Sequence, residues 1–114
     1  MVSDVVRKQA EEMSSGLATL AEPHRLLILR QLRRGPRTAG ALARALDVPA
    51  PLASHHLGVL LDAGLVERRK VGAFVCYTVR RDRLRLLHDR VGRMAGLLGA
   101  AAAHADAVGE RDPC

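Results

Sequence analysis

The sequence predicts a mainly α-helical fold with a small β-hairpin, arranged as a winged helix-turn-helix. Apolar residues recur at steps of three and four along most of the 114 residues, as on helices that bury one face. Between Val66 and Val79 the period changes to two, which is typical of paired strands. The predicted order is therefore four helices, the hairpin and a last helix, within a single domain spanning residues 1–114.

A proline separates the first two predicted helices. The first, about residues 4–21, carries an apolar stripe of Val6, Ala10, Met13 and Leu17. Pro23 suits the first turn of the second helix, because its missing N–H would be unpaired there. On that helix the leucines expected to face the core are Leu26, Leu29 and Leu32. Gly35 and Pro36 are expected to end it.

The block of about residues 38–63 predicts a helix-turn-helix. Thr38 is a suitable N-cap for its short first helix, and the prolines of DVPAP break the chain before the second. Pro51 fits the first turn of that second helix, which ends near Gly64. The second helix of such a pair can enter a major groove, which is about 12 Å wide. We therefore expect it to read DNA.

A wing of about residues 66–79 follows, with its turn expected at residues 70–73. Three consecutive cations lie along the first strand of the wing toward its tip, where a phosphate backbone would lie: Arg68, Arg69 and Lys70. The last helix, about residues 81–99, repeats the apolar spacing at Leu84, Leu87, Val91, Met94 and Leu98. Residues 100–114 lose the pattern, and we expect a frayed or disordered tail.

The composition favours a polyanionic partner. Lys and Arg number 18 against 12 Asp and Glu, a net charge of +6. Aromatic residues make up only 2%, which argues against proteins that stack bases on aromatic platforms. No apolar run approaches the roughly 20 residues of a membrane span, and no secretory leader is evident. A cytoplasmic protein without a membrane partner is expected.

Three segments carry a family resemblance: LAEPHRLLILRQL at residues 20–32, ALARALDVPAPLASHHLGVLLDAGLVERRKVG at residues 41–72, and FVCYTV at residues 74–79. In these segments the chain resembles the ArsR/SmtB family of winged-helix transcriptional regulators, over roughly residues 17–98. The resemblance implies a regulator that binds a palindromic operator and most often represses, although activation stays open. The family's wing often has Arg directly after its Gly, where this chain has Ala73.

Positions within the helix-turn-helix and the wing predict which residues contact DNA. Phosphate contacts are assigned to Arg37, Thr38, His55, Arg68, Arg69 and Lys70. Ala50 and Pro51 offer apolar contacts to a thymine methyl, and Ser54 and His55 offer hydrogen bonds to base edges. Helix capping is the alternative role for Arg37 and Thr38. His56, in the family's S-x-H-L pattern, is expected to be partly buried and to orient the reading helix.

A palindromic operator requires two reading helices about 34 Å apart, and hence a two-fold homodimer. The predicted interface is formed by the first and last helices through nine residues: Val6, Ala10, Met13, Leu17, Leu84, Leu87, Val91, Met94 and Leu98. The alternative is that both stripes pack onto their own domain.

No cofactor is expected at the positions that the family uses for metal ions. The cysteines of its arsenic sensors are missing from RTAGALARAL, residues 37–46. At the last-helix sites for zinc or nickel this chain has Arg81 or Asp82, Arg83, Met94 and Leu97, and neither Arg nor Leu offers a lone pair. Weak candidates for a transition metal are His88, His104, Asp106 and Cys114. Three routes of regulation therefore remain open: a separate sensor protein, a small organic effector, or the expression level of the protein.

Two other functions compete with operator binding: a protein-interaction module built on a winged helix, and a nonspecific DNA-binding protein. An enzyme is disfavoured, because no nucleophile, base and orienting group stand together in the sequence, and no glycine-rich phosphate loop is present.

Overall fold

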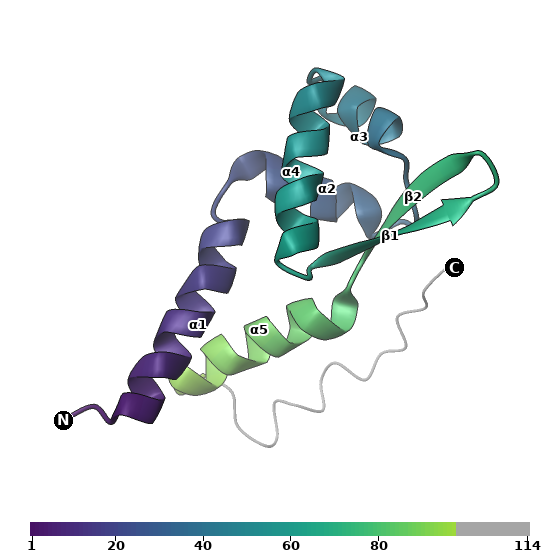
Figure 1. Cartoon of the computed structure of the whole chain (residues 1–114). Helices are drawn as coiled ribbons and strands as arrows, with labels where there is room; N and C mark the ends of the chain where they lie inside the picture. The colour runs from purple at the N-terminus through teal and green to yellow at the C-terminus, as the bar shows by residue number, and fades with distance from the viewer. Residues whose placement is uncertain (98–114) are drawn as a thin grey trace.

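The computed structural model describes residues 1–97, and their elements follow the predicted order (Figure 1). The elements are α1 (Asp4–Leu20), α2 (Pro23–Leu32), α3 (Ala39–Leu46), α4 (Ala50–Asp62), β1 (Val66–Val71), β2 (Phe74–Val79) and α5 (Arg81–Met94). The winged helix-turn-helix prediction is confirmed. Leu98 and the predicted tail at residues 100–114 lie outside the described residues.

Side-chain caps start three of the helices. The hydroxyl oxygen of Ser3 accepts a hydrogen bond from the backbone N–H of Val6 at 3.2 Å. Thr38 caps α3 in the same way, with the backbone N–H of Ala41 at 3.1 Å. Glu22 caps α2, whose first residue is the proline that the sequence predicted there. These caps set the first residues of α1, α2 and α3.

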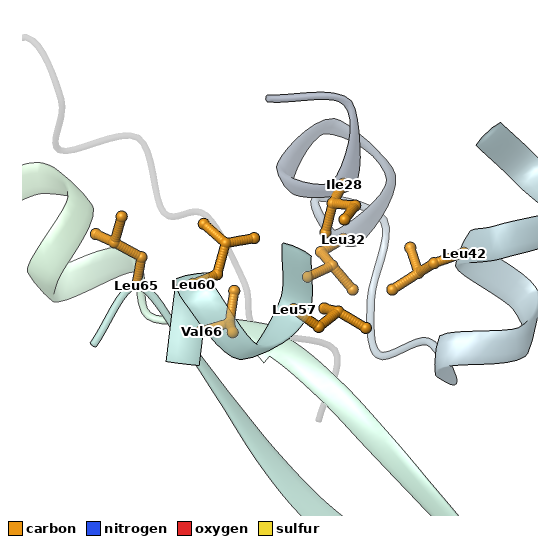
Figure 2. Packing of buried hydrophobic residues seen from close by; sticks show 7 residues of the cluster. All are labelled: Ile28, Leu32, Leu42, Leu57, Leu60, Leu65 and Val66. Carbon is orange, nitrogen blue, oxygen red and sulfur yellow. The ribbon is translucent and has the colours of Figure 1, made fainter. Parts of the chain in front are cut away.

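The core lies where α2, α3, α4 and the start of β1 meet (Figure 2). Its members are Ile28, Leu32, Leu42, Leu57, Leu60, Leu65 and Val66. Leu32 was predicted correctly, but Leu26 is 52% exposed, so the prediction that it faces the core is wrong. Residues four apart share a helix face, and α2 buries the pair Ile28 and Leu32. Leu29 packs only at the margin of the core.

The wing is a regular antiparallel hairpin in which Val66 pairs with Val79 and Val71 pairs with Phe74. Its turn is only Gly72 and Ala73, shorter than the predicted residues 70–73, because Lys70 and Val71 still belong to β1. Gly72 has a φ of 60°, in the left-handed region that tight hairpin turns require. The base of the wing is buried, whereas residues 71–75 at its tip are exposed.

Helices α1 and α5 pack against each other and project from the helix-turn-helix block (Figure 1). Gly16 permits their close approach, since a Cβ atom there would lie 3.1 Å from the methyl groups of Leu87. Met13 of α1 is buried in the single chain. Every helix within residues 1–97 is too short or too polar to span a lipid bilayer.

Candidate nucleic-acid interface

The first half of α4 presents a continuous exposed face. Successive residues on a helix are about 100° apart, so one face can be buried while the next residue points outward. The buried side consists of Ala53, His56, Leu57 and Leu60. The four residues predicted to meet bases are all exposed: Ala50, Pro51, Ser54 and His55. The exposed side of α4 therefore has the position and shape that insertion into a major groove requires.

The adjacent histidines have opposite environments. His55 is exposed, whereas His56 is only 6% exposed. The guanidinium of Arg25 lies 3.2 Å from Nδ1 of His56 and donates a hydrogen bond to it. The rings of His56 and His24 are stacked, with centroids 5.1 Å apart. The expected burial of His56 is confirmed, and Arg25 and His24 of α2 contact its ring.

Glu22 completes this cluster at the start of α2. One carboxylate oxygen lies 2.9 Å from Nδ1 of His24, and the other accepts the backbone N–H of Arg25 at 3.0 Å. Nε of Arg25 also donates to the carbonyl oxygen of Thr19 at 2.6 Å. We call Glu22, His24, Arg25 and His56 the α2–α4 lock, because they join the start of α2 to the reading helix.

The pKa values of His56 and Glu22 in this lock both lie below their ordinary values. Burial lowers the pKa of His56, and the nearby positive charge of Arg25 lowers it further, against the opposing effect of Glu22. The pKa of Glu22 is also below its ordinary value, because its hydrogen bonds to His24 and the N–H of Arg25 outweigh the effect of desolvation. A neutral His56 ring can accept the hydrogen bond from Arg25.

Glu22, His24 and His56 bring potential ligand atoms within 4.8 Å of one another. Two features disfavour a metal ion there. Arg25 occupies the Nδ1 lone pair of His56 and adds a positive charge. The two rings are within 16° of parallel, so their in-plane lone pairs do not converge on one point. The geometry suits a hydrogen-bonded lock better than an ion site.

The wing carries its cations on both faces. In an antiparallel pair, residues directly opposite share a face, and neighbours along a strand alternate. Arg68 pairs with Tyr77 and Lys70 with Val75, whereas Arg69 pairs with Cys76 on the other face. All three cations are exposed. Arg69 thus shares its face with Val71 and Phe74 at the tip, and Arg68 and Lys70 lie on the opposite face.

Arg37 and Thr38 lie between α2 and α3 and are half-buried. The oxygen of Thr38 caps α3, which supports the capping alternative, although a hydroxyl that accepts can still donate its hydrogen to a phosphate. Arg37 pairs through its backbone with Tyr77 of β2, at 3.1 and 2.8 Å. Nε of Arg37 is buried and has no hydrogen-bond partner among the described residues. Arg37 therefore anchors the wing to the helix-turn-helix.

The predicted DNA-contacting residues of α4 and β1 are held near one another by the core. The exposed residues of α4 and the cations of β1 lie on elements that the core holds together, since Leu57, Leu60 and Val66 are members of one cluster.

The weak metal candidate His88 is exposed and contacts Asp89 at 3.0 Å. His104, Asp106 and Cys114 lie outside the described residues. The sequence did not predict that Glu22, His24 and Arg25 cluster with His56, although a capping carboxylate stands before Pro23.

Comparison with known proteins agrees with this architecture. A family model described as a helix-turn-helix domain matches residues 20–69. The biofilm growth-associated repressor of Agrobacterium fabrum is 36% identical over 78 residues, which cover 68% of this chain and 67% of that protein. The transcriptional regulator NmtR of Mycobacterium tuberculosis is 40% identical over 70 residues, covering 61% of this chain and 58% of NmtR.

A solved structure extends the match to the helices outside the helix-turn-helix. It is the homodimeric winged helix-turn-helix DNA-binding domain Mb0332 of Mycobacterium bovis, described as a possible ArsR-family transcriptional regulator. The TM-score is 0.65 at 31% identity, and the match covers 83% of this chain and 88% of that one. The similarity therefore includes helices that flank the central block as well as the block itself.

Proposed function

Because this chain belongs to the ArsR/SmtB family of winged-helix transcriptional regulators, we propose that it represses transcription by binding a palindromic operator as a homodimer. The observation that carries the proposal is the exposed N-terminal half of α4 beside a basic wing. A helix in the major groove reads bases, and cations on an adjoining ribbon hold the phosphates. Ser54 and His55 would supply the hydrogen bonds to bases, and Arg68, Arg69 and Lys70 the phosphate contacts.

The homodimer is proposed to form through α1 and α5. Four residues of the predicted stripe are exposed in the single chain and free to pack against a second copy: Val6, Ala10, Leu17 and Met94. A groove of about 570 Å³ between α1 and α5 is lined in part by Val6 and Met94. Met13 and Leu84 are turned toward their own chain, and Leu87 and Val91 are half-buried, so they contribute less. The homodimeric state of Mb0332 supports the formation of a homodimer.

We propose further that operator binding needs no metal ion at the family's last-helix sites. At those positions Arg81, Arg83 and Leu97 offer no lone pair to a metal. The signal would then come from a separate sensor protein or from a small organic effector. No residue is assigned a catalytic role, consistent with a regulator whose output is DNA occupancy.

Selection of binding sites from a pool of random duplexes tests the proposal directly. The full chain, challenged with competitor DNA at physiological salt, is expected to enrich a palindrome whose half-sites lie about 10–10.5 base pairs apart. His55→Ala is expected to alter the enriched bases, because each good base contact discriminates by about 1–3 kcal/mol. Arg69→Ala serves as the matched control and should enrich the same palindrome with lower affinity. Enrichment of no sequence would favour a nonspecific or protein-binding role instead.

A further inference from the structure

A second concave site lies between α2, β2 and α5, and none of its lining residues is a proposed DNA contact. It has a volume of about 360 Å³, within the range of roughly 300–1,000 Å³ that is usual for small-molecule sites. Its floor is apolar and is formed by Leu29, Val79 and Leu84. These three side chains pack against the core on their other side, so the floor is held in place by the fold.

The rim of this groove is cationic. Its polar lining residues are Arg33, Arg81, Arg85 and His88, and none of the seven lining residues is acidic. The guanidinium of Arg81 donates to the backbone carbonyl of Arg33 at 3.3 Å, which ties the start of α5 to the end of α2 across the groove. Arginine is well suited to a planar anion, because its fork of N–H donors matches the two oxygens of a carboxylate.

We propose that this groove binds an organic anion with an apolar body, such as a medium-chain carboxylate, and that this ligand regulates operator binding. An inorganic anion would leave the apolar floor uncovered, and a neutral hydrocarbon would leave Arg33 and Arg81, which form no ion pair with a carboxylate of the described residues, without a counter-charge. Only a molecule with both parts matches both halves of the lining. The regulatory part of the inference rests on the proposed function, whereas the binding part stands by itself.

The position of the groove explains how a ligand would act on DNA binding. One wall is α2, which packs against α3 and α4 of the helix-turn-helix. The other wall is α5, which packs against α1 and is part of the proposed dimer interface. A ligand between them would change the angle between the reading unit and the dimer helices. Since a palindrome requires two reading helices about 34 Å apart, a small change in this angle alters operator affinity.

Titration calorimetry on the full chain tests the site with three probes. Decanoate, kept below the concentration at which it forms micelles, is expected to bind with one site per chain. Decanol, which lacks the charge, and sulfate, which lacks the apolar body, are expected to bind at least tenfold more weakly. Equal binding of decanoate and decanol, or of decanoate and sulfate, would overturn the proposed ligand class.

Substitutions of lining residues test whether decanoate binds in this groove. The double variant Arg33→Gln with Arg81→Gln is expected to lower decanoate affinity at least tenfold. Arg30→Gln is the matched control, because it removes a charge from α2 outside the groove and should bind decanoate as the wild type does. Circular dichroism spectra and melting temperatures establish that each variant is folded. Unchanged decanoate affinity in the double variant would overturn the location.

Operator affinity measured in the same samples separates this inference from the proposed function. Saturating decanoate is expected to change operator affinity at least fivefold in the wild type and to leave the double variant unaffected. Normal operator binding without any effect of decanoate would overturn the regulatory inference alone. Failure of the ligand-free wild type to bind any selected palindrome would instead overturn the proposed function, whatever decanoate does.

Discussion

Replacing His56 by alanine tests whether the α2–α4 lock holds the reading helix. The variant loses a hydrogen bond from the charged Arg25, which contributes about 1.5–3 kcal/mol, and a ring stack on His24, which contributes about 0.5–1.5 kcal/mol. The expected loss in the free energy of unfolding is therefore about 2–4 kcal/mol. For a domain of this size that corresponds to a fall of about 10–20 °C in melting temperature.

The neighbouring histidine supplies the control. His55 is exposed, so His55→Ala is expected to change the free energy of unfolding by less than about 0.5 kcal/mol. His56→Asn places an amide oxygen near the position of Nδ1 and should recover part of the loss, because it can accept from Arg25. Urea unfolding and thermal melts at one fixed protomer concentration measure both quantities, since dimerisation makes stability concentration-dependent. Equal losses from His55→Ala and His56→Ala would refute the lock.

Further predictions concern pH, salt, packing and the α1–α5 contact. Because burial lowers the pKa of His56 in the folded chain, the unfolded chain takes up a proton first as the pH falls. The contribution of His56 to the free energy of unfolding is therefore complete above pH 6.5, and it declines as the pH falls from 6.5 through the lower pKa of the folded chain. Urea unfolding on both sides of that pH should show a shallower decline for His56→Asn than for the wild type. Arg69→Ala is expected to weaken binding to all duplexes alike and to reduce the slope of log affinity against log salt by about 1, as followed by fluorescence anisotropy; a loss confined to one sequence would contradict a phosphate contact. Leu60→Ala should cost about 2–5 kcal/mol in urea unfolding, because Leu60 is fully buried, and a loss below this range would argue against the core described. Gly16→Val should cost about 1–3 kcal/mol by crowding Leu87 and should also weaken self-association in sedimentation experiments, an effect that would be missing if α1 and α5 did not form the interface.

The order of elements is predictable from the sequence because several elements carry their own boundary signal. Pro23 opens α2, Thr38 caps α3, and a change of period from three or four to two begins at Val66. The face of a helix is harder to predict where apolar residues are consecutive. Residues 26–29 are all apolar, so periodicity alone does not choose between Leu26 and Ile28, and packing against α3 and α4 decides.

The candidate site is predictable only where exposure follows from position on one element. The exposure of Ser54 and His55 could be predicted because they lie one step from buried neighbours on the same helix. The lock could not be predicted, since Arg25 and His56 are 31 residues apart and meet only when α2 and α4 pack. The face of the wing on which each cation lies could not be predicted either, because it depends on a strand register that the two-residue turn sets.

The backbone bridge between Arg37 and Tyr77 constrains how this protein can be switched. Two hydrogen bonds fasten the hairpin to the segment that begins α3, so the ribbon has no independent hinge at its base. The wing and the helix-turn-helix of one chain are therefore held in a fixed relation, and moving one relative to the other would require breaking this bridge. In the proposed homodimer, a change in operator affinity would then come from the angle between two reading units whose internal geometry is fixed.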